Sequence, residues 1–217
     1  MEKRAQAQAE DSNIKIYFEN RFLSKRIEFL EDYDFESDKT NYIYFKNFIL
    51  NFELTNNDWY NSLIIELADR LEIVDNVLYD RYLEYLSHRR HYLFKLSILD
   101  YFINNHSFYY KIYKADDFKS IYDMKSTKYI VKNQIIVNNL FFIQQDRDAQ
   151  IEELLINMEK TTDYRSHIRV INYIMNFELD NFIDIKKLRD LITITLSKKF
   201  GRAVDLKLIE FKDYLQI

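Results

Sequence analysis

The run His-Arg-Arg-His at residues 88–91 is the densest group of side chains in the chain that could do acid–base or metal chemistry. His88 and His91 are three positions apart, a spacing that on a helix would put both imidazoles on the same side. A metal would need more ligands than these two. Three nearby carboxylates could supply them: Asp80, Glu84 and Asp100.

The patterns that usually mark a helical metal site are nevertheless missing. Neither His-Glu-x-x-His nor Glu-x-x-His occurs in the sequence. An apolar run, Tyr92 to Phe102, follows the cluster directly, which favours a short basic connector that opens a helix. We therefore expect no catalytic residue, no bound metal and no cofactor here.

The composition excludes other chemistries and predicts the fold class. The chain has 217 residues with one glycine, no proline and no cysteine. Thiolate zinc sites, Gly-rich phosphate loops and Gly-x-Ser-x-Gly nucleophile motifs are therefore ruled out. Sheets need many tight turns that glycine usually supplies, whereas helices joined by polar segments do not. The sequence predicts an all-α protein, either a solenoid of helical hairpins or an irregular helical bundle.

The spacing of apolar residues agrees with helices. In "NYIYFKNFILNFEL" the apolar residues recur at three- and four-residue steps, which is one face of a helix. Residues 203–211, "AVDLKLIEF", alternate enough for a short strand but also fit a helix, and we expect the helix. Gly201 is placed where a glycine would end the preceding helix. Helix-capping residues are predicted from sequence type at four positions: Thr55 with Asp58, Asp116, Asp148 and Asp184.

A short pattern recurs along the chain. Two aliphatic residues, a polar or acidic residue, a variable position and another apolar residue begin at Ile64, Ile98, Ile136 and Val170. The starts are 34, 38 and 34 residues apart, which leaves space for one more helix between each pair. Stacked helical hairpins produce such a period because each hairpin buries its apolar face against its neighbours. A repeat array and an irregular bundle both remain open.

Two of these segments carry a family resemblance. "YIVKNQIIVNNLFF" and "SHIRVINYIM", each with an aliphatic-basic pair leading into an apolar helix, resemble the second helices of HEAT or armadillo-like repeats, and "HRRHYLFKLSILDYF" is a looser version. The resemblance covers residues 57–200. The chain departs from the family in lacking the proline that often bends the first helix and in having few small alanines. The resemblance implies a curved scaffold whose second helices grip a partner.

Charge suggests which surfaces would meet that partner. The net charge is −4, whereas duplex-binding domains are usually strongly basic, so nucleic acid is disfavoured as a partner. Basic residues that could meet at the starts of successive second helices form one candidate surface: His88, Arg89, Arg90, Lys132, Arg165 and Arg169. Acids in the stretch 28–38 form another, which would dock a basic partner: Glu31, Asp32 and Asp34.

Two functions follow as hypotheses. The favoured one is a noncatalytic protein-binding helical scaffold or inhibitor, of an immunity type or encoded by a phage. The alternative is a metal-dependent or nucleic-acid-processing helical enzyme that uses the region of His88 and His91. We expect residues 1–12 to form a flexible tail and 13–217 a single all-helical domain. We also expect a cytoplasmic protein with no membrane partner, and self-association through its many tyrosines stays open.

Overall fold

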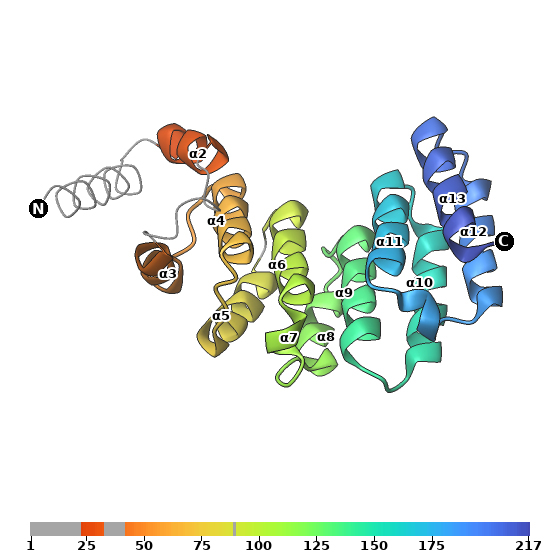
Figure 1. Ribbon diagram of the computed structural model, residues 1–217, viewed down its shortest axis with the longest axis horizontal. Helices are drawn as coiled ribbons and strands as arrows, with labels where there is room; N and C mark the ends of the chain where they lie inside the picture. The colour runs from red at the N-terminus through yellow and green to blue at the C-terminus, as the bar shows by residue number, and fades with distance from the viewer. Residues whose placement is uncertain (1–22, 33–41, 89) are drawn as a thin grey trace, which may run out of the picture. The chain divides into compact units, whose positions relative to one another are not determined.

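The computed structural model describes residues 23–32, 42–88 and 90–217, and within these ranges it is helical with no strand (Figure 1). The all-α prediction is confirmed. Two compact units divide the chain between Phe108 and Tyr109. The first contains α2 (Leu23–Asp32), α3 (Tyr42–Leu50), α4 (Asp58–Arg70), α5 (Asn76–Ser87) and α6 (Tyr92–Asn104), and the short α7 (His106–Tyr109) lies at the boundary. The second contains α8 (Ala115–Asp123), α9 (Tyr129–Phe142), α10 (Arg147–Lys160), α11 (Tyr164–Asn176), the 3-10 helix η2 (Leu179–Phe182), α12 (Ile185–Ser197) and α13 (Arg202–Leu215).

The first unit packs around α4 and α6. Helix α4 contacts α2, α3 and α6, and α6 also contacts α5. Aromatic residues fill much of the space between them: the Tyr82 ring meets the Tyr101 ring edge to face at a centroid distance of 5.0 Å. The Tyr101 hydroxyl donates to the carbonyl of Ile73 at 2.6 Å, so this fully buried phenol is satisfied.

In the second unit, each of the helices α9 to α13 packs on the α-helix two places along the chain, and some consecutive helices also pack together. Helix α9 packs against α11 and α11 against α13, while α10 packs against α9 and α12, and α8 covers α9 (Figure 1). Aliphatic residues of α9 to α13 form one buried cluster that includes Ile136, Leu154 and Ile171. Burial of this cluster stabilises the unit, at roughly 25 cal/mol per Å² of apolar surface removed from water.

The four segments that begin at Ile64, Ile98, Ile136 and Val170 lie in α4, α6, α9 and α11. Side-chain hydrogen bonds join α6 to α4 and α9 to α11 at similar sequence separations. Asn104 donates to Asp69 across 35 residues, and Asn133 donates to Ser166 across 33. The 34-residue spacing of the pattern within each pair therefore matches the spacing of the residues that hold the paired helices together.

Helix ends differ in part from the sequence prediction. Asp184 caps α12 by accepting from the Lys186 N–H at 2.7 Å, as expected. Asp116 and Asp148, by contrast, lie inside the first turns of α8 and α10, where they interact with the helix dipole instead. For α4 the cap is Asn57, whose side chain accepts from the Tyr60 N–H.

The predicted role of Gly201 is also corrected. Helix α12 ends at Ser197, and the left-handed residue after it is Lys199 at φ 53°. Gly201 instead precedes α13 at φ 100° and ψ −175°, a conformation that is essentially restricted to glycine. The glycine is thus needed to start α13. Residues 203–211 lie within that helix, as expected.

No described helix combines the length and the apolar character that crossing a membrane would require.

His167 is a fully buried imidazole inside the second unit. It lies on α11, with Nδ1 2.9 Å from Thr195 Oγ1 of α12 and its ring 4.8 Å from the Phe200 ring centroid. Because the Thr195 hydroxyl donates to the Leu191 carbonyl, its oxygen is able to accept the Nδ1–H. Burial lowers the pKa of His167 to about 4.

His167 should therefore make the folded state sensitive to acid. The unfolded imidazole takes up a proton near pH 6.5, whereas the folded one resists protonation until about pH 4. Its contribution is complete above pH 6.5 and is lost as the pH falls toward 4, by about 3 kcal/mol at most. Urea unfolding at pH 7, 5.5 and 4.5 measures this loss.

The variant His167→Phe should lose this part of the pH dependence, while His106→Gln, at an exposed histidine, should keep it. Because the carboxylates titrate in all three proteins, only the difference between their profiles is diagnostic. Parallel profiles for wild type and His167→Phe would contradict the assignment.

Candidate functional site

The His-Arg-Arg-His region lies between α5 and α6. His88 is the residue that follows α5, and His91 is the N-cap of α6, where Nδ1 faces the Leu93 N–H at 3.4 Å. The two imidazoles therefore do not share a helix face, because the chain changes direction between them. Arg89 is outside the described residues.

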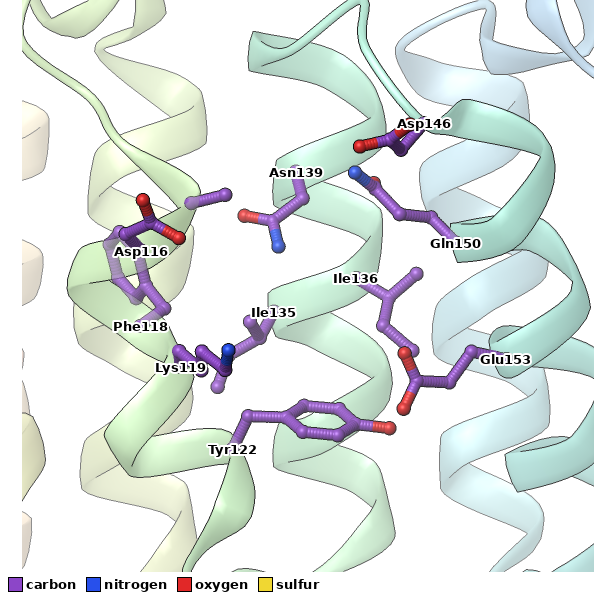
Figure 2. Close-up of a pocket in the computed structure, with 11 residues that line it drawn as sticks. Asp116, Phe118, Lys119, Tyr122, Ile135, Ile136, Asn139, Asp146, Gln150 and Glu153 are labelled. Carbon is purple, nitrogen blue, oxygen red and sulfur yellow. The ribbon is translucent and has the colours of Figure 1, made fainter.

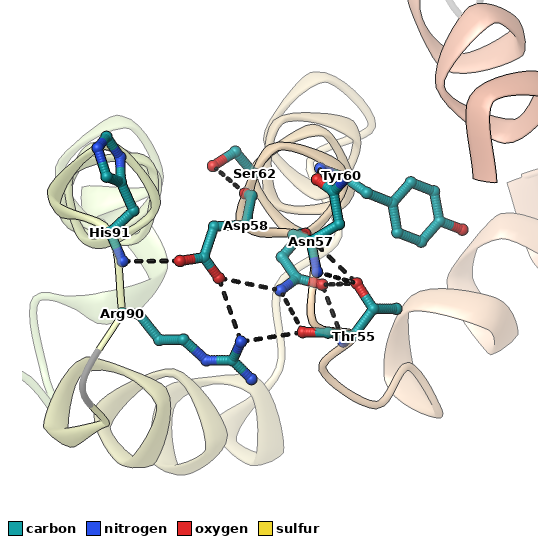
Figure 3. Close-up of polar contacts among 8 residues, drawn as sticks. Thr55, Asn57, Asp58, Tyr60, Ser62, Arg90 and His91 are labelled. Carbon is teal, nitrogen blue, oxygen red and sulfur yellow. Dashed lines mark hydrogen bonds and ion pairs between the residues drawn. The ribbon is translucent and has the colours of Figure 1, made fainter.

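Asp58 of α4 binds this connector through both carboxylate oxygens (Figure 3). Oδ2 accepts the His91 backbone N–H at 2.7 Å, and Oδ1 lies 3.3 Å from Arg90 Nη1. The same guanidinium nitrogen donates to the Thr55 carbonyl at 3.0 Å. Arg90 and the His91 backbone are thus used to fix the start of α6 to the start of α4.

The segment before α4 closes the same network (Figure 3). The Thr55 hydroxyl donates to Asn61 Oδ1 at 2.9 Å, and Asn61 Nδ2 donates back to the Thr55 carbonyl at 3.1 Å. Because Asn61 is fully buried, these bonds remove the cost of an unsatisfied amide. The geometry is that of a structural junction between two helices.

Metal binding at this connector finds no support in the described part of the chain, where no group of three or more His, Asp and Glu side chains is arranged to hold an ion. The carboxylates at Asp80, Glu84 and Asp100 were the extra ligands considered from sequence, and they do not complete such a group with His88 and His91.

The other basic candidates lie in the second unit, Lys132 on α9 and both arginines on the neighbouring α11. Arg165 makes two 2.8 Å bonds to Asp163 and thereby lowers the pKa of that carboxyl. Arg169 donates to Gln134 at 2.7 Å, and the Lys132 ammonium lies 4.8 Å from the Tyr122 ring centroid. These three side chains are thus partly engaged by their own unit.

Glu31 and Asp32 end α2, but their side chains are outside what is described, and Asp34 falls wholly outside the described residues.

A pocket that sequence reasoning missed opens between α8, α9 and α10, with a volume of about 370 Å³ (Figure 2). Its apolar wall is formed by Phe118, Ile135 and Ile136. Its charged residues come from α8 and from the start and middle of α10: Asp116, Lys119, Asp146 and Glu153. These residues are scattered over nearly forty positions of sequence, so no local motif could have identified them.

Hydrogen-bond acceptors outnumber donors in this pocket. Tyr122 accepts from Asn157 Nδ2 at 2.7 Å and hydrogen-bonds to the Glu153 carboxylate, and burial together with Glu153 raises the pKa of its phenol. The Gln150 Oε1 atom is buried without a hydrogen-bond partner among the described residues. Asn139 Oδ1 is already occupied by the Tyr113 hydroxyl at 2.8 Å.

The conformation of Asp146 leaves its carboxylate available to the pocket. It is the N-cap residue of α10 in the left-handed region, at φ 55° and ψ 27°, and its side chain makes no capping bond. In Figure 2 it lies next to Gln150 at the pocket's edge. With Asp116 and Glu153 it gives three carboxylates against the single ammonium of Lys119, so the lining is electronegative.

Comparison with known proteins adds no assignment: no protein-family model, no curated protein and no solved structure matches this chain.

Removing the Asp58 carboxylate should weaken the attachment of the start of α6 to the start of α4. Asp58→Ala leaves the His91 N–H without its acceptor and leaves the Arg90 guanidinium with only the Thr55 carbonyl, so we expect a loss of about 1–3 kcal/mol in the free energy of unfolding. Urea denaturation measures it. Asp80→Ala is the matched control, since Asp80 is an exposed helical aspartate.

A double-mutant cycle with Arg90→Ala separates the ion pair from the backbone contact. Equal destabilisation by Asp58→Ala and Asp80→Ala would show that the junction contributes nothing.

Proposed function

We propose that the chain is a noncatalytic helical scaffold or inhibitor that binds another protein, and that the pocket between α8, α9 and α10 receives a positively charged side chain of that partner. The observation that carries the proposal is the pocket's excess of acceptors: three carboxylates and the orphaned Gln150 Oε1 around an apolar wall.

Size and chemistry favour a side chain over a larger ligand. Ligand pockets usually span about 300–1,000 Å³, so this one is at the small end of the range. An arginine guanidinium offers five donors in a planar fork and forms strong charge-assisted bonds with carboxylates. Its methylene stem would lie along Ile135 and Ile136. Lys119 offsets only one of the three negative charges.

Tyr122 is not suited to act as a general base in this pocket. A general base at neutral pH needs a pKa near 7. Burial and Glu153 move the Tyr122 pKa upward instead, so its phenol keeps its proton. It then serves to hold the Glu153 carboxylate in place at the pocket.

The proposed scaffold is HEAT-like. Support comes from the packing of α9, α11 and α13 in one series and α10 with α12 in another, and from cross-helix bonds whose partners are 33 to 35 residues apart. Stacked hairpins of this kind present an extended, continuous binding surface.

The test is affinity capture with quantitative mass spectrometry, using wild type, the double variant Asp146→Asn/Glu153→Gln, and the control Glu159→Gln. Glu159 is an exposed residue of α10 that does not line the pocket. Partners bound by wild type and control should be depleted about tenfold or more with the double variant, since a lost charge-assisted contact costs at least ~1.4 kcal/mol.

Identical capture by all three proteins would contradict the pocket's role, and capture of nothing by any of them would contradict the scaffold function. Unfolding curves of the three proteins exclude a general loss of structure as the cause.

A further inference from the structure

Helix α13 has two apolar faces. Val204, Leu208 and Phe211 are buried in the cluster against α11. On the other side, Leu206 is 55% exposed and Ile209 is 56% exposed. At about 100° per residue, these two positions lie opposite the buried face. Large apolar side chains exposed side by side on one helix face indicate a binding surface.

Charged residues extend the exposed stripe in a patterned way. Arg202 precedes Leu206 by four positions and Asp213 follows Ile209 by four, so the order along one line of the helix is basic, apolar, apolar, acidic. The spacing of four, three and four residues is that of a helix–helix seam. Neither charged residue has an ion-pair partner within the described ranges.

This order is complementary to itself when reversed. In an antiparallel pair, Leu206 faces Ile209 of the other copy, and Arg202 faces Asp213, twice over. One flank of the stripe carries Asp205 and Lys212, and in this register Asp205 of each copy comes within two positions, about 3 Å along the axis, of Lys212 of the other. Opposite charges at such flanking positions set partner choice and orientation.

A parallel pair would have the reverse electrostatics. Arg202 would face Arg202, Asp213 would face Asp213, and Asp205 would come beside Glu210. Like charges in contact destabilise an interface, so the sequence of α13 selects one orientation. The remaining exposed acid, Glu210, is held by Lys207 on its own helix and stays at the edge.

We propose that α13 pairs with α13 of a second copy of this chain in an antiparallel, two-fold symmetric contact through Arg202, Leu206, Ile209 and Asp213. A two-fold contact uses the same patch on both copies, so it must be self-complementary, as this stripe is. The interface is separate from the pocket between α8, α9 and α10 and does not rest on the proposed function of that pocket.

Sedimentation velocity over a range of concentrations tests the contact. Wild type should show a dimer that dissociates on dilution, and Leu206→Glu should be monomeric. Because Leu206 is more than half exposed and outside the buried cluster, this variant should keep the wild-type unfolding midpoint. A wild type that is monomeric at every concentration would overturn the proposal.

A charge swap tests the orientation. Arg202→Asp and Asp213→Arg should each weaken the dimer by about tenfold or more, because each leaves two like-charged contacts. The double variant Arg202→Asp/Asp213→Arg should restore affinity to near wild type, since each contact again joins opposite charges.

In a parallel pair the double variant would still place like charges in contact. Its dimer affinity would then be no higher than that of Arg202→Asp alone. Failure of the double variant to recover, or dimers that ignore all three changes, would therefore overturn the antiparallel contact.

Discussion

Hydrogen bonds between buried or half-buried polar side chains of neighbouring helices set how α9 lies against α11. Asn133 is almost fully buried and donates to Ser166 at 2.9 Å, and one residue later Gln134 accepts from Arg169 at 2.7 Å. Sliding α11 along α9 by one turn would break both bonds and leave buried groups unpaired, at about 1–3 kcal/mol each.

The register of the helices determines where the pocket forms. With α9 fixed against α11 and α10 packed across α9, the polar edge of α10 lies opposite α8. Asn157 of α10 and Tyr122 of α8 meet at 2.7 Å, and this bond orients the phenol toward Glu153. The electronegative lining is therefore a consequence of helix packing, and it is formed before any partner arrives. Pre-formed sites lose less conformational entropy on binding.

The fold class and most helices could be predicted from the sequence, because composition determines the class and local periodicity determines the helices. One glycine and no proline exclude sheet-rich folds, and the 3.6-residue period is visible wherever one helix face is buried. Asp184 was correctly predicted as a cap. Asp116 and Asp148 were wrongly predicted as caps, because the sequence alone does not distinguish an acid at the cap position from one in the first turn of the helix. The pocket was missed since Asp116 and Glu153 meet only through packing of α8 and α10 across α9.

The proposal that the pocket binds a cationic side chain can be tested most directly by methyl NMR. In protein with labelled isoleucine methyl groups, a short arginine-containing peptide is predicted to shift the signals of Ile135 and Ile136, which line the pocket. A glutamate-containing peptide should leave them unchanged, and Glu153→Gln should weaken the arginine response. Shifts confined to residues outside the pocket, or equal responses to both peptides, would contradict the proposed site.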